Sequence, residues 1–391
     1  MLNTALSPWP SFTQEEADAV SRVLLSNKVN YWTGSECREF EKEFAAFAGT
    51  QYAVALSNGT LALDVALKAM GIGAGDDVIV TSRTFLASAS CIVTAGANPV
   101  FADVDLNSQN ISAETIKAAL TPNTKAIIVV HLAGMPAEMD DIMDLAKEHD
   151  LWVIEDCAQA HGAKYKGKSV GSIGHVGAWS FCQDKIMTTG GEGGMVTTND
   201  KELWRKMWSY KDHGKSYDAV YHREHAPGFR WLHESFGTNW RMMEMQAVIG
   251  RIQLKRMPEW TARRQAHAAK LAESLGKFAS IRLIKVADYI EHAQYKFYAF
   301  VKPEHLKEGW MRDRIVNELN ARKVPCYQGS CSEVYLEKAF DNTPWRPKER
   351  LKNAVELGDT SLMFLVHPTL TDDEIAFCKE HIEAVLAEAT A

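Results

Sequence analysis

Residues 124–158 read TKAIIVVHLAGMPAEMDDIMDLAKEHDLWVIEDCA, which combines a strand pattern, a helix pattern and a second strand pattern. The strand patterns at 124–132 and 151–158 are continuous apolar runs, and the helical pattern lies between them at 139–150. Strands that are apolar along their length are typical of a parallel sheet buried on both faces. The segment therefore predicts a β-α-β unit of an α/β fold, in which ligands bind at the carboxyl ends of the strands.

The same alternation of strands and helices extends toward the N-terminus. Further strands are predicted at 52–56, 76–82 and 98–105. Further helices are predicted at 14–26, 35–48, 59–73, 85–97 and 111–120. In the second of these helices three phenylalanines recur at helical spacing, and Gly49 follows as a stop signal. The pattern predicts a large α/β domain with a mostly parallel sheet, flanked by helices.

The last third of the chain has a different pattern. Residues 243–275 read as long helical sequence with a break near Pro258, and 295–301 (YKFYAFV) alternate as a strand does. A helix follows at 309–323, and Thr371 is the predicted N-cap of a final helix. We therefore predict a large domain over residues 1–254 and a smaller C-terminal α+β domain over residues 255–391.

Composition sets limits on function. The 391 residues are 46% hydrophobic and 24% charged with a net charge of −7, values that fit a soluble protein and argue against nucleic-acid binding. The sequence has no apolar run long enough to span a membrane, and its start, MLNTALSPWPSFTQEE, does not read as a signal peptide. The seven scattered cysteines lack zinc spacing, so we expect no metal site and a reducing cytoplasmic location.

Two of the predicted strand ends carry groups suited to a phosphorylated aromatic ligand. Asn58, Gly59 and Thr60 join a strand to a helix, and free N–H groups at a helix N-terminus suit a phosphate. Taken alone, these residues could equally form an ordinary capped turn. Phe85 follows the next strand and could stack on a planar ring, although a core position is the simpler interpretation.

Two more strand ends carry ionisable groups. Asp156 ends the apolar run at 151–156, where a carboxylate needs a partner, and Gln159 follows it. Asp156 could pair with a protonated ring nitrogen, or it could cap a following helix. The stretch AWSFCQDKIMTTGGEGGM at 178–195 holds Ser180 and Lys185. Lys185 could be a reactive amine beside flexible backbone, or a solvated lysine in a surface loop.

Together the four stretches offer a phosphate cradle, an aromatic stacking residue, a carboxylate and a lysine. Pyridoxal phosphate has the matching features: a phosphate, an aromatic ring, a basic ring nitrogen and an aldehyde. A lysine forms the Schiff base with the aldehyde, and a carboxylate keeps the ring nitrogen protonated so that the ring accepts electrons. The combination therefore predicts a site for pyridoxal phosphate.

These residues lie in stretches that resemble the DegT/DnrJ/EryC1/StrS sugar aminotransferases, which have the aspartate aminotransferase fold (fold type I of the pyridoxal-phosphate enzymes). The resemblance runs nearly end to end and includes 33–63, 71–89, 129–142, 153–181, 188–200 and 237–250. It implies an α/β large domain, with a mostly parallel sheet of the seven-stranded type flanked by helices, and a smaller C-terminal α+β domain. It also implies an aminotransferase that acts on a keto sugar.

The resemblance assigns a role to each candidate residue. Lys185 matches the Schiff-base lysine, and Asp156 matches the acid paired with the ring nitrogen. Phe85 and Gln159 match residues on the two faces of the ring. The residues that match the phosphate site are Gly59, Thr60 and Ser180, with Asn58 beside them. Asn239 in GTNWRM matches an asparagine that reaches the phosphate of the neighbouring subunit, which implies a homodimer with shared active sites.

The sequence also departs from the family pattern. The stretch TTGGEGG is one residue longer than the usual TTGEGG, which leaves the position of Glu192 open. Gln183 stands where many members have a histidine. Segment 324–340 replaces one that often carries a substrate-facing histidine, and within it Tyr327 and Ser330 are the candidate substrate residues. Some members with histidine at the lysine position are dehydratases, so Lys185 indicates a transaminase.

The resemblance implies a ping-pong reaction in which L-glutamate donates its amine, through pyridoxamine phosphate, to a keto sugar. We expect a nucleotide-linked 4-keto-6-deoxyhexose aminated at C-4, in the biosynthesis of amino sugars or surface polysaccharide. A C-3 keto sugar, a free keto sugar and a cyclitol ketone are alternatives. A nicotinamide-dependent oxidoreductase would need a G-x-G-x-x-G after the first strand, which is absent. A non-enzymatic regulator is the remaining alternative.

Overall fold

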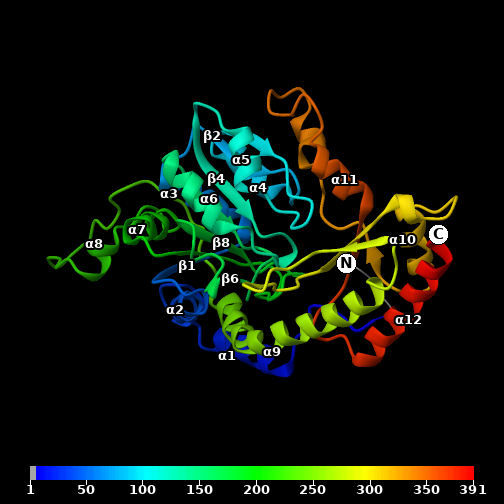
Figure 1. Cartoon of the computed structure of the whole chain (residues 1–391). Helices are drawn as coiled ribbons and strands as arrows, with labels where there is room; N and C mark the ends of the chain where they lie inside the picture. Colours follow the sequence, from blue (N-terminus) through cyan, green and yellow to red (C-terminus); the bar gives the residue numbers. More distant parts are fainter. Residues whose placement is uncertain (1–5) are drawn as a thin grey trace.

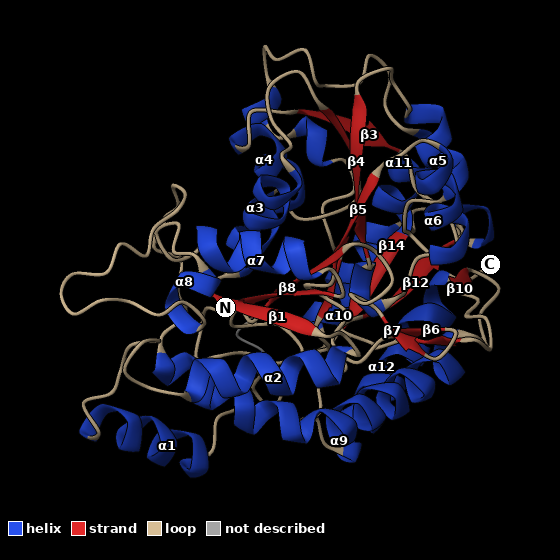
Figure 2. Cartoon of the chain, turned by 90° about the vertical axis from the view of Figure 1, so that its left-hand side faces the viewer, coloured by secondary structure: helices blue, strands red, loops and turns tan. Residues whose placement is uncertain are grey.

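The computed structural model describes residues 6–391 and is built around a seven-stranded sheet (Figures 1 and 2). The strand order is β1-β9-β8-β5-β4-β2-β3. These strands are β1 (Tyr52–Leu56), β2 (Asp77–Thr81), β3 (Asn98–Ala102), β4 (Thr124–Val130), β5 (Trp152–Asp156), β8 (Val176–Ser180) and β9 (Gly194–Thr198). Neighbours from β8 to β3 pair in parallel, whereas β9 is antiparallel to both β8 and β1. The predicted α/β fold with a mostly parallel sheet is confirmed, with β9 as the reversed strand.

Helices cover both faces of this sheet, as Figure 2 shows. The helices of this part are α1 (Gln14–Leu25), α2 (Glu36–Ala48), α3 (Gly59–Met70), α4 (Ala87–Thr94), α5 (Ala113–Ala119), α6 (Met139–Glu148), α7 (Lys201–Tyr210) and α8 (Tyr217–Tyr221). Alternate residues of one strand enter different cores: Val78 and Val80 of β2 pack with α3 and α4, and Ile79 packs with α5 and α6. This two-sided burial explains why the strands are apolar along their length.

The ends of several helices follow directly from the sequence. α2 ends at Gly49 and α3 ends at Gly71, with φ angles of 69° and 76°, a left-handed conformation that glycine adopts without steric cost. The Asn58 side chain accepts a hydrogen bond from the backbone N–H of Leu61 and thereby caps α3. Thr371 caps the final helix in the same way, as predicted.

A second, antiparallel sheet of order β10-β12-β14-β13 lies in the C-terminal part of the chain (Figure 1). Its strands are β10 (Ile281–Leu283), β12 (Phe297–Val301), β13 (Cys326–Tyr327) and β14 (Ser361–Phe364). The helices of this part are α10 (Arg312–Ala321), α11 (Lys352–Thr360) and α12 (Asp372–Ala389). A small third sheet joins β6 (Lys164–Tyr165), β7 (Lys168–Ser169) and β11 (Ile290–Glu291). The second sheet shares its own apolar core with α10, α12 and the end of α9.

Helix α9 (Glu244–Leu275) connects the two larger sheets along one side of the molecule (Figure 1). The predicted break near Pro258 is wrong, because α9 continues through this residue. A proline inside a helix removes one backbone hydrogen bond, but Met257 and Trp260 on either side are buried in the core, and this packing holds the helix together. The proposed domain boundary at 254/255 falls inside α9. No helix within residues 6–391 combines the length and the apolar character that crossing a membrane requires.

Candidate active site

A cavity of about 720 Å³ opens where β4, β5 and β8 reach their carboxyl ends. It brings together most of the residues singled out in the sequence. The predicted residues that line it are Asn58, Gly59, Thr60, Phe85, Asp156, Gln159, Ser180, Lys185 and Ser330. A parallel sheet binds ligands at this edge, and the cavity is large enough for a small-molecule ligand.

The N-terminus of α3 forms one end of the cavity. The Asn58 side chain accepts the hydrogen bond of the Leu61 N–H. The N–H groups of Gly59 and Thr60 have no intrahelical acceptor, because they are in the first turn of the helix. A Cβ on Gly59 would lie 2.5 Å from the Cβ of Ser180, so only glycine fits here beside the serine. The arrangement combines two N–H groups, two hydroxyl groups and the positive end of a helix dipole, which suits a phosphate.

Asp156 is buried at the end of β5, with 6% of its surface exposed. Its Oδ2 accepts a hydrogen bond of 2.8 Å from the Ser88 hydroxyl, and its Oδ1 accepts one of 3.1 Å from the Ala158 N–H. No helix begins within residues 157–163, so the alternative that Asp156 caps a helix is wrong. The carboxylate is fixed in position and still lines the cavity, where it can accept a hydrogen bond from a ligand.

Phe85 and Gln159 lie in the same cavity. The Phe85 side chain is 71% exposed, so a core position is wrong and its ring is free to stack on a ligand. The Gln159 side chain is held by its Oε1, which accepts a hydrogen bond of 2.8 Å from the Ala133 N–H. Its amide NH₂ group retains its donors for a ligand.

Lys185 follows β8 in a segment whose backbone is held at several points. The Trp9 indole donates a hydrogen bond of 2.9 Å to the Lys185 carbonyl, and the Thr188 hydroxyl donates one of 3.0 Å to the Phe181 carbonyl. The Lys185 ammonium enters the cavity and lies 5.4 Å from the centre of the Tyr295 ring. Lys185 is therefore a cavity residue rather than a solvated lysine of a surface loop.

The glycine-rich stretch after Lys185 places Glu192 at the cavity as well. Gly190 and Gly191 have φ angles of 87° and 125°, which residues with a side chain rarely adopt. The Glu192 carbonyl accepts hydrogen bonds from the Thr189 hydroxyl and the Gln246 amide. The additional glycine is thus accommodated in a tight turn that returns the chain to β9.

Two predicted site residues do not line this cavity. Asn239 is exposed and lies beside the phosphate cradle of its own chain, because the next residue, Trp240, accepts a hydrogen bond of 3.1 Å from the Ser57 N–H. Tyr327 belongs to β13 at the edge of the second sheet and lies outside the cavity lining, whereas Ser330 is part of it. The candidate substrate role of Tyr327 therefore has no support from its position.

A model of the DegT/DnrJ/EryC1/StrS aminotransferase family matches residues 10–383. The chain belongs to this family. The predicted family, fold and enzyme class are thereby confirmed, and the nicotinamide-dependent alternative is set aside.

Comparisons with individual proteins agree with this assignment. The aminotransferase is 34% identical to the GDP-perosamine synthase of Escherichia coli O157:H7, over 95% of this chain and 96% of that protein. Its fold matches the crystal structure of an aminotransferase from Psychrobacter cryohalolentis with a TM-score of 0.97 and 65% identity, covering 98% and 99% of the two chains. It also matches DesV of S. venezuelae, solved with a ketimine intermediate, with a TM-score of 0.85 and 32% identity over 95% and 94% of the chains.

The structure of the aminotransferase adds cavity residues that the sequence analysis missed. Tyr295 and Lys296 come just before β12, Tyr298 lies within it, and Asp184 precedes Lys185. The Tyr295 hydroxyl donates a hydrogen bond of 2.5 Å to Asp184. Burial alone would raise the pKa of Asp184, but the Lys185 charge and this hydrogen bond hold it below its ordinary value. The alternation at 295–301 was a signal that Lys296 and Tyr298 share one face.

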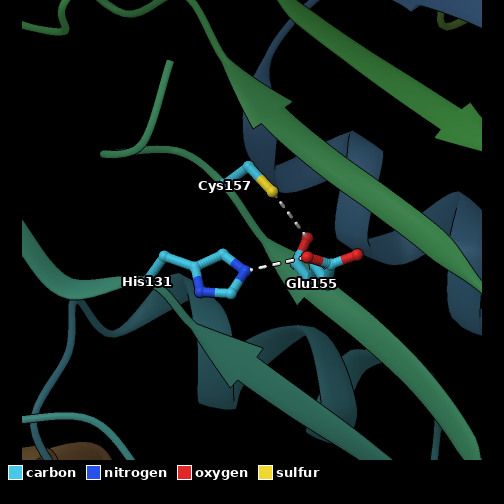
Figure 3. Close-up of side chains that lie close together, drawn as sticks. All are labelled: His131, Glu155 and Cys157. Carbon is cyan, nitrogen blue, oxygen red and sulfur yellow. Dashed lines mark hydrogen bonds and ion pairs between the residues drawn. The ribbon is translucent and has the colours of Figure 1, made fainter. Parts of the chain in front are cut away.

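A buried cluster behind the site joins His131, Glu155 and Cys157 (Figure 3). His131 Nδ1 accepts a hydrogen bond from the Ala137 N–H, so the ring proton is on Nε2, which donates to Glu155 over 2.9 Å. Glu155 also accepts hydrogen bonds from the N–H groups of Gly171, Ile173 and Gly174. With both histidine nitrogens and the carboxylate engaged in this way, the cluster is a hydrogen-bond network rather than a metal site.

Glu155→Gln should destabilise the fold by about 3 kcal/mol, because an amide cannot satisfy the donors that surround the carboxylate. Burial would raise the pKa of Glu155, but the His131 and backbone N–H donors hold it below the ordinary value of 4.5. Glu155 therefore stabilises the fold above about pH 4.5, and this contribution is lost as the pH falls through the lower, folded-state pKa. Urea unfolding at pH 7 and at lower pH checks both statements, with the exposed Glu291→Gln as control. A difference from wild type that does not shrink in acid would contradict them.

Proposed function

We propose that the chain is a pyridoxal-phosphate-dependent aminotransferase that moves an amine from L-glutamate to a nucleotide-linked keto sugar. The preferred acceptor is a 4-keto-6-deoxyhexose aminated at C-4. The proposal rests on one observation: a single cavity is lined by Lys185, Asp156, Phe85 and the N-terminus of α3. The near full-length similarity to GDP-perosamine synthase supports a nucleotide-linked acceptor.

The cavity residues fit the cofactor group by group. Gly59, Thr60 and Ser180 would bind the phosphate, since Gly59 packs closely on Ser180 and all three residues bring N–H or hydroxyl donors to the cavity at the N-terminus of α3. The exposed ring of Phe85 would stack on the pyridine ring. Gln159 would contact the opposite face or the 3-hydroxyl through its free amide donors. When bound, pyridoxal phosphate supplies an aldehyde and an electron-accepting ring.

Asp156 would keep the ring nitrogen protonated, and Lys185 would transfer the proton of the substrate. The Asp156 carboxylate, held by Ser88 and Ala158, would accept a hydrogen bond from the ring nitrogen and keep that nitrogen protonated. The Lys185 amine, once displaced by the donor amine, would carry a proton at Nζ to and from the substrate carbon. Trp9 donates a hydrogen bond to the Lys185 carbonyl, so the backbone that carries the amine is held in position.

Incubation with L-glutamate and a panel of nucleotide-linked keto sugars, followed by mass spectrometry, tests the acceptor. Conversion of the carbonyl at C-4 of a 4-keto-6-deoxyhexose to an amine is the expected result. Amination at C-3, or of a free keto sugar or cyclitol ketone alone, would contradict the preferred acceptor while leaving the aminotransferase assignment intact. No amination of any acceptor would contradict the proposal itself.

We further propose a homodimer in which Asn239 completes the phosphate site of the partner subunit. Asn239 is exposed and adjacent to the cradle, so it lies where a second copy could bring it to a cofactor. The chain after α8 stands away from the sheets in Figures 1 and 2 and carries three exposed aromatic side chains. These are Phe229, Trp231 and Phe236, which are 76%, 77% and 98% exposed. Such an apolar arm fits a contact with another copy of the chain.

Mixing two inactive variants tests the shared site. At a limiting concentration of pyridoxal phosphate, Asn239→Ala should be inactive because it binds the cofactor weakly, and Lys185→Ala should be inactive because it lacks the amine. Refolded or exchanged mixtures of the two should recover activity, because a mixed dimer contains one site with both native residues. Recovery toward about a quarter of the wild-type value is expected for random pairing, since half of the dimers are mixed and each has one intact site. No recovery in mixtures that contain mixed dimers would contradict shared sites.

A further inference from the structure

We infer that Lys296 and Tyr298 form a carboxylate subsite that binds the α-carboxylate of the amino donor. The inference rests on the proposed function and names the part of the site that holds one of its substrates. Lys296 immediately precedes β12 and Tyr298 lies within it. Both side chains line the cavity that contains Lys185.

Lys296 is a half-buried cation at the cavity. Its ammonium lies 4.7 Å from the centre of the Tyr295 ring. The nearest candidate counter-ion, Asp184, is engaged by the Tyr295 hydroxyl, and Lys296 forms no ion pair or hydrogen bond with any of residues 6–391. Burial, with the charges of Arg264 and Lys185 nearby, lowers the pKa of Lys296 to about 8, although the charge of Asp184 acts in the opposite direction. A charge in such a position is costly unless an anion arrives to pair with it.

Tyr298 supplies a neutral donor beside this charge. Its hydroxyl oxygen accepts a hydrogen bond of 2.9 Å from the Ser330 N–H, which leaves the hydroxyl proton available for an acceptor in the cavity. The ring is fixed from two sides. The Arg83 guanidinium lies 5.7 Å from its centre, and a Cβ on Gly329 would overlap it. An ammonium and an oriented hydroxyl together are a good match for a carboxylate.

The position of the subsite favours the amino donor over the diphosphate of a nucleotide sugar. The ammonium groups of Lys185 and Lys296 lie 5.4 and 4.7 Å from the centre of the same ring, that of Tyr295, so an anion bound to Lys296 lies near the amine of Lys185. In an amino acid the α-carboxylate is bonded to the carbon that carries the amine. In a nucleotide-linked hexose the diphosphate is on C-1, and at least two ring carbons separate it from a carbonyl carbon at C-3 or C-4.

Binding of glutarate, a dicarboxylate without an amine, tests the subsite directly. Isothermal titration of the holoenzyme should show glutarate binding that weakens roughly 10- to 100-fold in Lys296→Met, the loss expected for a charged hydrogen bond. Tyr298→Phe removes a hydroxyl without changing the ring and should weaken binding roughly 3- to 10-fold. Lys296→Arg keeps the charge and should retain most of the affinity. Lys302→Met, which lies outside the cavity, is the matched control.

Two reactions of the holoenzyme separate carboxylate binding from an effect on Lys185. The rate with L-glutamate, followed by loss of visible absorbance, should fall in Lys296→Met by the same factor as glutarate binding. The rate with hydroxylamine, which has no carboxylate, should stay within about twofold of wild type. Unchanged glutarate binding in both Lys296→Met and Tyr298→Phe would overturn the inference, as would an equal loss with hydroxylamine. A wild-type protein that does not respond to L-glutamate would instead contradict the proposed function.

Discussion

Lys185→Ala should abolish transamination, with a loss of roughly 10⁴-fold or more, since the variant lacks both the amine that binds the cofactor and the group that carries the proton. The fold should survive, because the side chain points into the cavity and the segment is held through its backbone by Trp9 and Thr188. Steady-state assays with L-glutamate and an accepted keto sugar measure the loss. Circular dichroism checks the fold.

Lys302→Met is the control for the general effect of removing a lysine, since it lies beyond the end of β12 and away from the cavity. It should retain full activity. A Lys185→Ala enzyme that turns over at more than about a hundredth of the wild-type rate would rule out the assigned role, because a residual rate of that size fits a merely supporting residue.

Asp156→Asn should keep the cofactor bound and lower the turnover rate by roughly 100-fold or more, the scale of losing one oriented electrostatic partner. The amide has the same shape: its oxygen can accept the hydrogen bond from the Ala158 N–H, and its NH₂ group can donate to the Ser88 hydroxyl in the reverse direction. What is lost is the negative charge that would keep the ring nitrogen protonated. The rate of the L-glutamate half-reaction, together with the dissociation constant for pyridoxal phosphate, distinguishes the two effects.

Ser88→Ala is a milder change at a residue that contacts the Asp156 carboxylate. It removes one hydrogen bond to Asp156 but leaves the charge, so a fall of roughly 3- to 10-fold is expected. An Asp156→Asn enzyme with the wild-type rate, or one that loses the cofactor without any change in the rate of the loaded fraction, would count against the ring-nitrogen role.

Much of the large domain could be predicted because the local signals and the packing agree. The apolar runs of β2, β4 and β5 lie in the interior of the sheet, and Gly49 and Gly71 end their helices as the sequence indicates. The direction of β9 could not be predicted, because strand direction depends on how the chain returns from the Lys185 segment rather than on residue pattern. The continuity of α9 through Pro258 depends on tertiary packing, which outweighs the local cost of the proline.

The candidate site also contains residues that the sequence predicts and residues that only the tertiary packing brings to the cavity. Asp156 and Lys185 stand at strand ends of one sheet edge, so the fold itself brings them into one cavity. Lys296 and Tyr298 are more than a hundred residues away from Lys185 in sequence and reach the cavity through the packing of the second sheet against the first. No local pattern reports such packing. Alternation in YKFYAFV indicated a shared face, but only the assembled structure shows which surface that face meets.

The absorbance spectrum of the purified protein before and after addition of L-glutamate tests the central claim most directly. With pyridoxal phosphate supplied, a band in the visible or near-ultraviolet should report the cofactor bound to Lys185, and L-glutamate should convert it to the pyridoxamine form. After removal of unbound cofactor, Lys185→Ala should show no Schiff-base band, and treatment with borohydride should leave no cofactor attached to the denatured variant. A protein that stays colourless in the presence of pyridoxal phosphate, or whose spectrum does not change with L-glutamate, would contradict the account.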